Sequence, residues 1–213
     1  MAISQGNKKT RGPAKVSRLV VPAASAIEHV RELAAAGQHA RAIELATSAL
    51  AARDLRDADR LDLLDFRATS FIAMGELNQA AADAKNMLAK VRRTGGPALL
   101  AQALNLRALV EIRMGGSRLA LATAAQALAA ARQSKHSLLE AVSLFRLAEA
   151  QFRQRRNEDA SKAATQAARL FKKIGHAAGQ GRALWALAAA RSSQGRVADA
   201  NHAAREALVL ARS

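Results

Sequence analysis

The sequence predicts an all-α protein, a solenoid built from five helical hairpins, and three observations support this. Half of the 213 residues are hydrophobic, so the chain can form a continuous core. Most of these are Ala and Leu, which favour helix, whereas the chain has five Phe, one Trp and no Tyr. The third observation is an internal repeat of about 40 residues that covers almost the whole chain.

The repeat is defined by the pattern Gly-x4-Ala-x3-Ala-x2-Ala, which first occurs at Gly37, Ala42, Ala46 and Ala49. It returns four times, with Met87 in place of the last Ala in the second copy, Arg155 in place of Gly in the fourth, and steps of 38, 40, 40 and 40 residues. The five copies begin at Gly37, Gly75, Gly115, Arg155 and Gly195. A Gly at this position suits a left-handed helix C-cap, so each copy predicts a helix, a tight turn and a second helix.

Two rows of apolar residues precede the turn and define the buried face of each first helix. The row eleven residues before the turn contains Ala26, Leu64, Leu104, Leu144 and Leu184. The row seven residues before it contains Val30, Ala68, Ala108, Ala148 and Ala188. The two rows are four residues apart and therefore share one helix face, which we expect to pack against the second helix.

The five hairpins follow one another without a long linker. They are predicted to span residues 23–53, 57–94, 97–134, 137–174 and 177–212. Asp57 is a suitable N-cap for the second hairpin, and Pro97 suits the first helical position of the third. Gly175 is expected to end the second helix of the fourth hairpin. No segment inside residues 23–213 marks a second domain.

Residues 1–22 differ from the repeats in composition. They contain five basic and no acidic residues, and Gly and Pro interrupt any helix. We therefore expect a disordered basic arm. Such an arm could tether the protein electrostatically to nucleic acid or membrane, or simply keep it in solution, and the sequence leaves both interpretations open.

The pattern resembles the tetratricopeptide repeat (TPR), in which a turn Gly is followed by a small residue five positions on and an Ala seven positions beyond it. The resemblance covers residues from about 24 to 212. The longer repeat, about 40 rather than 34 residues, is similar to arrays in bacterial regulatory and signalling proteins. It implies a right-handed solenoid whose first helices line a groove, and a scaffold, adaptor or sensor module that holds a peptide or helix of a partner.

Repeat position predicts which residues face that groove. The predicted partner-binding residues are Asn105, Arg113, Phe145, Arg146, Phe152, Arg153, Arg182 and Trp185. Arg beside aromatic residues is typical of interface anchors, and Asn can pair with the backbone of an extended peptide. The alternative is that the aromatic residues pack against neighbouring helices and the Arg residues are merely solvated.

The charge of the chain points to acidic partners. Its formal net charge is +16, so we expect a bias toward acidic proteins or peptides. Non-specific binding to nucleic acid is the alternative function, supported by the same charge and by the basic arm. Few aromatic residues are available to stack on bases, which favours the protein-binding interpretation. The apolar sequence around Leu208 and Leu210 at the end of the fifth hairpin predicts packing against a second copy or a partner, or a longer polypeptide, and self-association is the hypothesis to test.

No sequence feature predicts catalysis, a cofactor or a metal site. The chain has no Cys, no phosphate-binding Gly loop, and five scattered His without a paired-His motif. The acidic run from Asp54 to Asp65 alternates with Arg and is interpreted as a salt-bridged helix start. No apolar segment approaches the about 20 residues of a membrane span. We therefore expect a cytoplasmic, non-enzymatic protein.

Overall fold

The computed structural model describes residues 23–52 and 54–212, which contain ten helices and no strand. The predicted basic arm lies outside these residues. The helices are α1 (Ala23–Ala35), α2 (His39–Leu50), α3 (Asp57–Ala73), α4 (Leu77–Thr94), α5 (Pro97–Arg113), α6 (Ser117–Ser134), α7 (Ser137–Arg153), α8 (Asn157–Lys173), α9 (Ala177–Ser193) and α10 (Val197–Arg212). Each odd-numbered helix forms a hairpin with the even-numbered helix that follows it.

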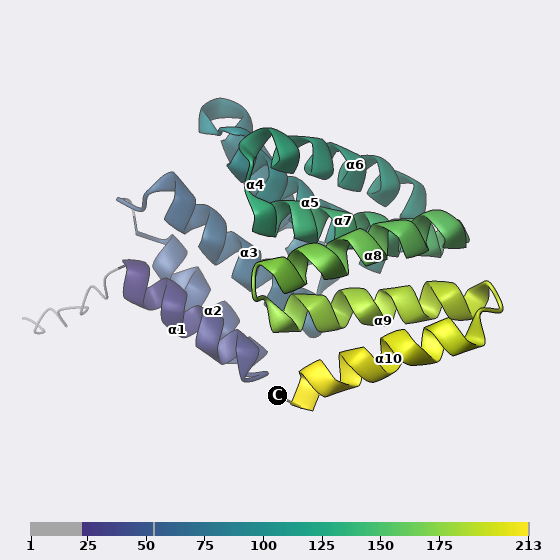
Figure 1. Cartoon of the computed structure of the whole chain (residues 1–213). Coiled ribbons are helices and arrows are strands. Elements are labelled where there is room, and N and C mark those ends of the chain that lie inside the picture. The colour runs from purple at the N-terminus through teal and green to yellow at the C-terminus, as the bar shows by residue number, and fades with distance from the viewer. Residues whose placement is uncertain (1–22, 53, 213) are drawn as a thin grey trace, which may run out of the picture.

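The hairpins stack in chain order into a curved array, as Figure 1 shows from α1 to α10. Every helix packs against its neighbours in the chain, and each odd-numbered helix also contacts the next odd-numbered one. Among the described residues, the even-numbered helices contact only their chain neighbours. The odd-numbered helices therefore form the inner layer and the even-numbered helices the outer layer. The predicted all-α solenoid of five hairpins is confirmed.

The predicted apolar rows form the core. Both rows of the first helices, from Ala26 and Val30 onward, are buried in all five hairpins. The first Ala of the repeat pattern is buried at each of its five occurrences, Ala42 to Ala200. Because these residues are small, the two helices of a hairpin can approach closely.

The turn position has a left-handed backbone in every hairpin, as predicted. The φ angles are 73° at Gly37, 80° at Gly75, 82° at Gly115 and 75° at Gly195. Arg155 adopts the same conformation with a φ of 58°, although a side chain there costs about 1 kcal/mol. The repeated fold thus imposes its turn geometry even where Gly is absent.

The helix starts confirm one prediction and correct another. Pro97 occupies the first position of α5, where its missing N–H costs nothing. Asp57 is not the N-cap of α3, because the extended residue Arg56 holds that position. Asp57 and Asp59 lie in the first turn instead, where the helix dipole favours negative charge. Asp59 accepts two hydrogen bonds of 2.7 Å from Arg56, so part of the acidic run is a salt-bridged helix start.

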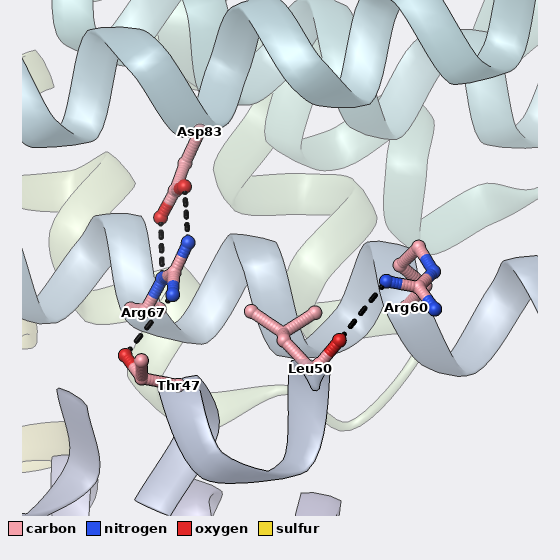
Figure 2. A network of polar contacts seen from close by, with 5 residues as sticks. All are labelled: Thr47, Leu50, Arg60, Arg67 and Asp83. Carbon is pink, nitrogen blue, oxygen red and sulfur yellow. Dashed lines mark hydrogen bonds and ion pairs between the residues drawn. The ribbon is translucent and has the colours of Figure 1, made fainter. Parts of the chain in front are cut away.

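A network of polar contacts joins the first two hairpins (Figure 2). Arg67 of α3 donates to both carboxylate oxygens of Asp83 in α4, at 2.9 and 2.6 Å, and to Thr47 of α2 at 3.0 Å. Arg60 donates to the backbone carbonyl of Leu50 at 3.2 Å, at the last residue of α2. Asp83 is only 3% exposed, so Arg67 compensates a buried charge and also ties α3 to α2.

Candidate interaction groove

An open groove of about 970 Å³ lies at the C-terminal end of the solenoid. It is lined by α7, α9 and α10, with the last residue of α5, Arg113, at one side. Most of the lining is apolar, from Phe145, Phe152, Trp185 and Leu208 together with several Ala residues. Its charged lining residues are Arg113, Glu149, Arg153 and Arg182. We refer to this feature as the groove.

The groove brings together six of the eight residues selected from the sequence. They are Arg113, Phe145, Phe152, Arg153, Arg182 and Trp185. They differ in accessibility, because Phe145 is 8% exposed whereas Trp185 is 68% exposed. Phe145 therefore belongs to the groove floor and also to the hydrophobic core, and Trp185 is the aromatic side chain most open to a ligand.

Asn105 and Arg146 do not line the groove. Asn105 is buried within α5, and among the described residues neither polar atom of its side chain has a hydrogen-bond partner. Arg146 is half-buried, donates to Glu149 at 2.7 Å and lies over the ring of Phe145 at 5.2 Å. These contacts give Arg146 a structural role in orienting Glu149 and covering Phe145.

The charge balance of the groove is positive. Its one carboxylate, Glu149, is already paired with Arg146 at 2.7 Å and lies 3.9 Å from Arg113. Among the described residues, no carboxylate lies within ion-pairing distance of Arg153 or Arg182. Partial burial lowers the pKa of Arg182, the positive charge of Arg146 lowers it further, and the negative charge of Glu149 acts in the opposite direction. Arg182 remains protonated, and a bound carboxylate would relieve this concentration of positive charge.

The contribution of α10 to the groove was not predicted. Leu208 and Leu210 were selected for self-association, yet both line the groove together with Ala204, Ala207 and Ala211. The repeat indicates this contribution of α10, because Leu208 is equivalent to Leu88 and Leu128, which lie on the packing face of their helices. Among the described residues no helix follows α10, and here the same face forms part of a groove.

A second group of polar residues lies on the inner layer, away from the groove. Gln102 of α5 donates to Asp62 at 2.9 Å and to Asp65 at 3.3 Å, both in α3. Burial raises the pKa of Asp65 to about 6, and the nearby charge of Asp62 adds to the rise. The hydrogen bond from Gln102 and the charge of Arg146 act in the opposite direction. Asp65 therefore stays protonated to a higher pH in the folded protein than a solvent-exposed Asp does.

Asp65→Asn is expected to make the protein more stable than wild type at neutral pH. The pKa of Asp65 rises on folding from 3.8 to about 6, so the folded protein binds this proton more tightly than the unfolded chain does. The resulting contribution to the free energy of unfolding is complete below about pH 4 and is lost as the pH rises through 6. Solvent screens this half-buried site, so we expect a gain of about 1–2 kcal/mol at neutral pH. Urea unfolding at several pH values would measure it, and an equal difference at every pH would contradict it.

No group of three or more His, Asp or Glu side chains that could hold a metal ion occurs among the described residues. In the same part of the chain, none of the helices combines the length and the apolar character needed to cross a membrane.

Comparison with known proteins identifies the fold. No family model matches the chain, and no curated protein is similar to it in sequence. The structure is similar to that of RapI in its apo form, with a TM-score of 0.66 and 14% identity over 93% of this chain and 86% of that one. BtubC (BKLC) from P. vanneervenii gives a TM-score of 0.64 at 15% identity, covering 94% and 92% of the two chains.

A third similar structure is the set of TPR-like repeats of a kinesin light chain from Podosopora anserina. It gives a TM-score of 0.63 at 20% identity, covering 90% of this chain and 97% of that one. Identities this low carry information about the fold alone. The described residues form a TPR-like solenoid, and the function must be argued from the groove.

Proposed function

We propose that this protein is an interaction scaffold that holds an acidic segment of a partner protein in the groove. The observation that carries the proposal is the exposed ring of Trp185 beside Arg153 and Arg182, two arginines that form no ion pair with any described residue. A large aromatic side chain supplies apolar contact area at low entropic cost, and Arg recognises carboxylates with directional hydrogen bonds.

The shape of the groove supports a macromolecular segment as its ligand. Its volume of about 970 Å³ is at the upper end of small-molecule sites, and it is open to solvent along one side. The Ala-rich floor between the aromatic residues offers apolar surface without polar groups that could act chemically. Binding and positioning of a partner, rather than catalysis, is the function that these side chains can perform.

The competing function is non-specific binding to nucleic acid through the net charge of +16. Charge reversals inside and outside the groove distinguish the two functions, because non-specific nucleic acid binding depends on the total charge and not on which residues carry it. Arg153 and Arg182 line the groove. Arg118 of α6 and Lys173 of α8 are also exposed, but they do not line it.

The double variant Arg153→Glu/Arg182→Glu is expected to lose the protein partner. The purified chain would be used to capture proteins from nuclease-treated host lysate, and Arg118→Glu/Lys173→Glu would serve as a control with the same change in net charge. Replacement of the two groove cations by anions should weaken partner binding by about 30-fold or more, which is the size of effect seen when interface hot-spot residues are changed. The control variant should bind like wild type.

Two results would contradict the proposal. If nuclease removes all material captured by wild type, the protein uses its charge to bind nucleic acid. If both double variants lose the partner equally, the net charge determines binding and the groove does not.

A further inference from the structure

The groove includes a surface that is covered in every preceding hairpin, and we call it the end face. It consists of Gly181 and Trp185 of α9 and Leu208 and Ala211 of α10. Leu208 is 50% exposed, whereas the equivalent residues Leu88 and Leu128 are each 8% exposed. Trp185 is 68% exposed, whereas Phe145 at the same repeat position is 8% exposed. The end face is thus equivalent to a packing surface of the solenoid, and none of the described residues covers it.

The interior hairpins show what covers such a surface. The equivalent face of the third hairpin is covered by the first helix of the fourth, since α7 packs against both α6 and α5. The same relation holds for α9 with α8 and α7. The covering elements α5, α7 and α9 are each a helix of 17 residues. The geometry of the end face therefore fits a helix.

Charge determines which helix is suitable. The groove beside the end face carries Arg113, Arg153 and Arg182 against the single, already paired Glu149. A second copy of the chain would bring a net charge of +16, and residues 1–22 contain basic residues without an acidic one. Both would be repelled, whereas a helix with carboxylates along one edge would meet the arginines without an ion pair.

We propose that an acidic amphipathic helix of a partner protein docks on the end face, in the position that the first helix of a further repeat would occupy. The proposal rests on the proposed function and specifies it, because it defines the ligand of the groove as a helix with an apolar face and an acidic edge. The apolar face covers Trp185 and Leu208, and the acidic edge pairs with Arg153 and Arg182.

A peptide derived from this chain can serve as the probe. The sequence of α7, Ser137–Arg153, covers the equivalent face of the third hairpin and contains two Glu and two Arg, so its side chains carry no net charge. An acidic peptide is obtained with Arg146→Glu and Arg153→Glu, which lower the net charge by four. A basic control peptide is obtained with Glu140→Lys and Glu149→Lys, which raise it by four. Neither peptide contains Trp.

Trp185 is the single Trp of the protein, so its fluorescence reports directly on the end face. Titration of the full chain with the acidic peptide should give a saturable blue shift of the emission, as the ring leaves water. The basic peptide should bind at least about tenfold more weakly, and Leu208→Asp in the protein should weaken the acidic peptide by at least about tenfold. Leu208 is half exposed, so this variant should keep its fold.

The peptide titration tests the docking of a helix independently of the proposed function. Absence of a blue shift with the acidic peptide would overturn the proposed helix, and the proposed function would stand if Arg153→Glu/Arg182→Glu still loses the captured partner. Equal binding of both peptides would overturn the acidic requirement. A blue shift that depends on protein concentration without peptide would overturn the proposal in favour of a second copy on the end face.

Discussion

Arg67→Ala is expected to lower the free energy of unfolding by about 3–5 kcal/mol, because it leaves the carboxylate of Asp83 buried without its cation. Asp83 is 3% exposed and accepts hydrogen bonds of 2.9 and 2.6 Å from the same guanidinium (Figure 2). The variant also removes the bond to Thr47, which links α3 to the first hairpin. The first hairpin should therefore lose its cooperative unfolding with the rest of the array.

A surface ion pair provides the matched control for this experiment. Lys162 and Glu158 lie 3.5 Å apart on α8, and their side chains are 66% and 64% exposed. Lys162→Ala should change stability by no more than about 0.5 kcal/mol. Urea unfolding followed by circular dichroism measures both variants. Equal and small losses would show that the Arg67–Asp83 pair contributes no more than a solvated pair.

Phe171→Ala is expected to cost about 3–5 kcal/mol, because it empties the largest fully buried side-chain site of the described residues. Phe171 of α8 is 1% exposed, and its ring occupies the space beside Gly179 of α9. A Cβ atom at residue 179 would lie 2.5 Å from two ring carbons of Phe171 and 2.7 Å from Nδ1 of His176, so the two rings together favour Gly at this position. Gly179→Leu alone should be destabilising for the same reason.

At the preceding junction, between the third and fourth hairpins, the small and the large side chain are exchanged. The residues equivalent to Phe171 and Gly179 are Ala131 and Leu139, which pack in one cluster. The local backbone is alike, since Gly179 donates to His176 at 2.9 Å and Leu139 donates to His136 at 3.4 Å. The double variant Phe171→Ala/Gly179→Leu should therefore recover about 2 kcal/mol relative to the sum of the two single variants.

Unfolding of wild type, both single variants and the double variant completes this comparison. Additive losses would contradict it, because they would mean that the two side chains do not share one space. A double variant more stable than either single one would show that each pair of adjacent hairpins needs a fixed total volume at this contact.

The fold could be predicted from the sequence because small residues recur at fixed spacing. Each Ala of the pattern must face a neighbouring helix for the hairpin to close, which determines the register of all five hairpins. The turn was identifiable even at Arg155, where the flanking pattern continues without Gly. The spacing of the small residues therefore determines the order and register of the hairpins, and the turn Gly is dispensable in the fourth hairpin.

The groove could be predicted only in part, since repeat position determines the direction of a side chain but not its exposure. Phe145 and Trp185 share a repeat position, yet one is covered by the following hairpin and the other is not. Asn105 is buried for the same reason as Phe145. Arg146 is withdrawn from the groove by Glu149, a contact that no spacing rule reveals.

Site-specific photocrosslinking tests the central claim, that the groove binds an acidic segment of a partner, most directly. A benzophenone amino acid would replace Trp185, which is 68% exposed in the groove, or Leu119, which is 61% exposed on α6. In nuclease-treated host lysate, we expect a discrete protein adduct from position 185 alone, and its loss in the Arg153→Glu/Arg182→Glu background. Identical adducts from both positions, or adducts only with nucleic acid when nuclease is omitted, would contradict the claim.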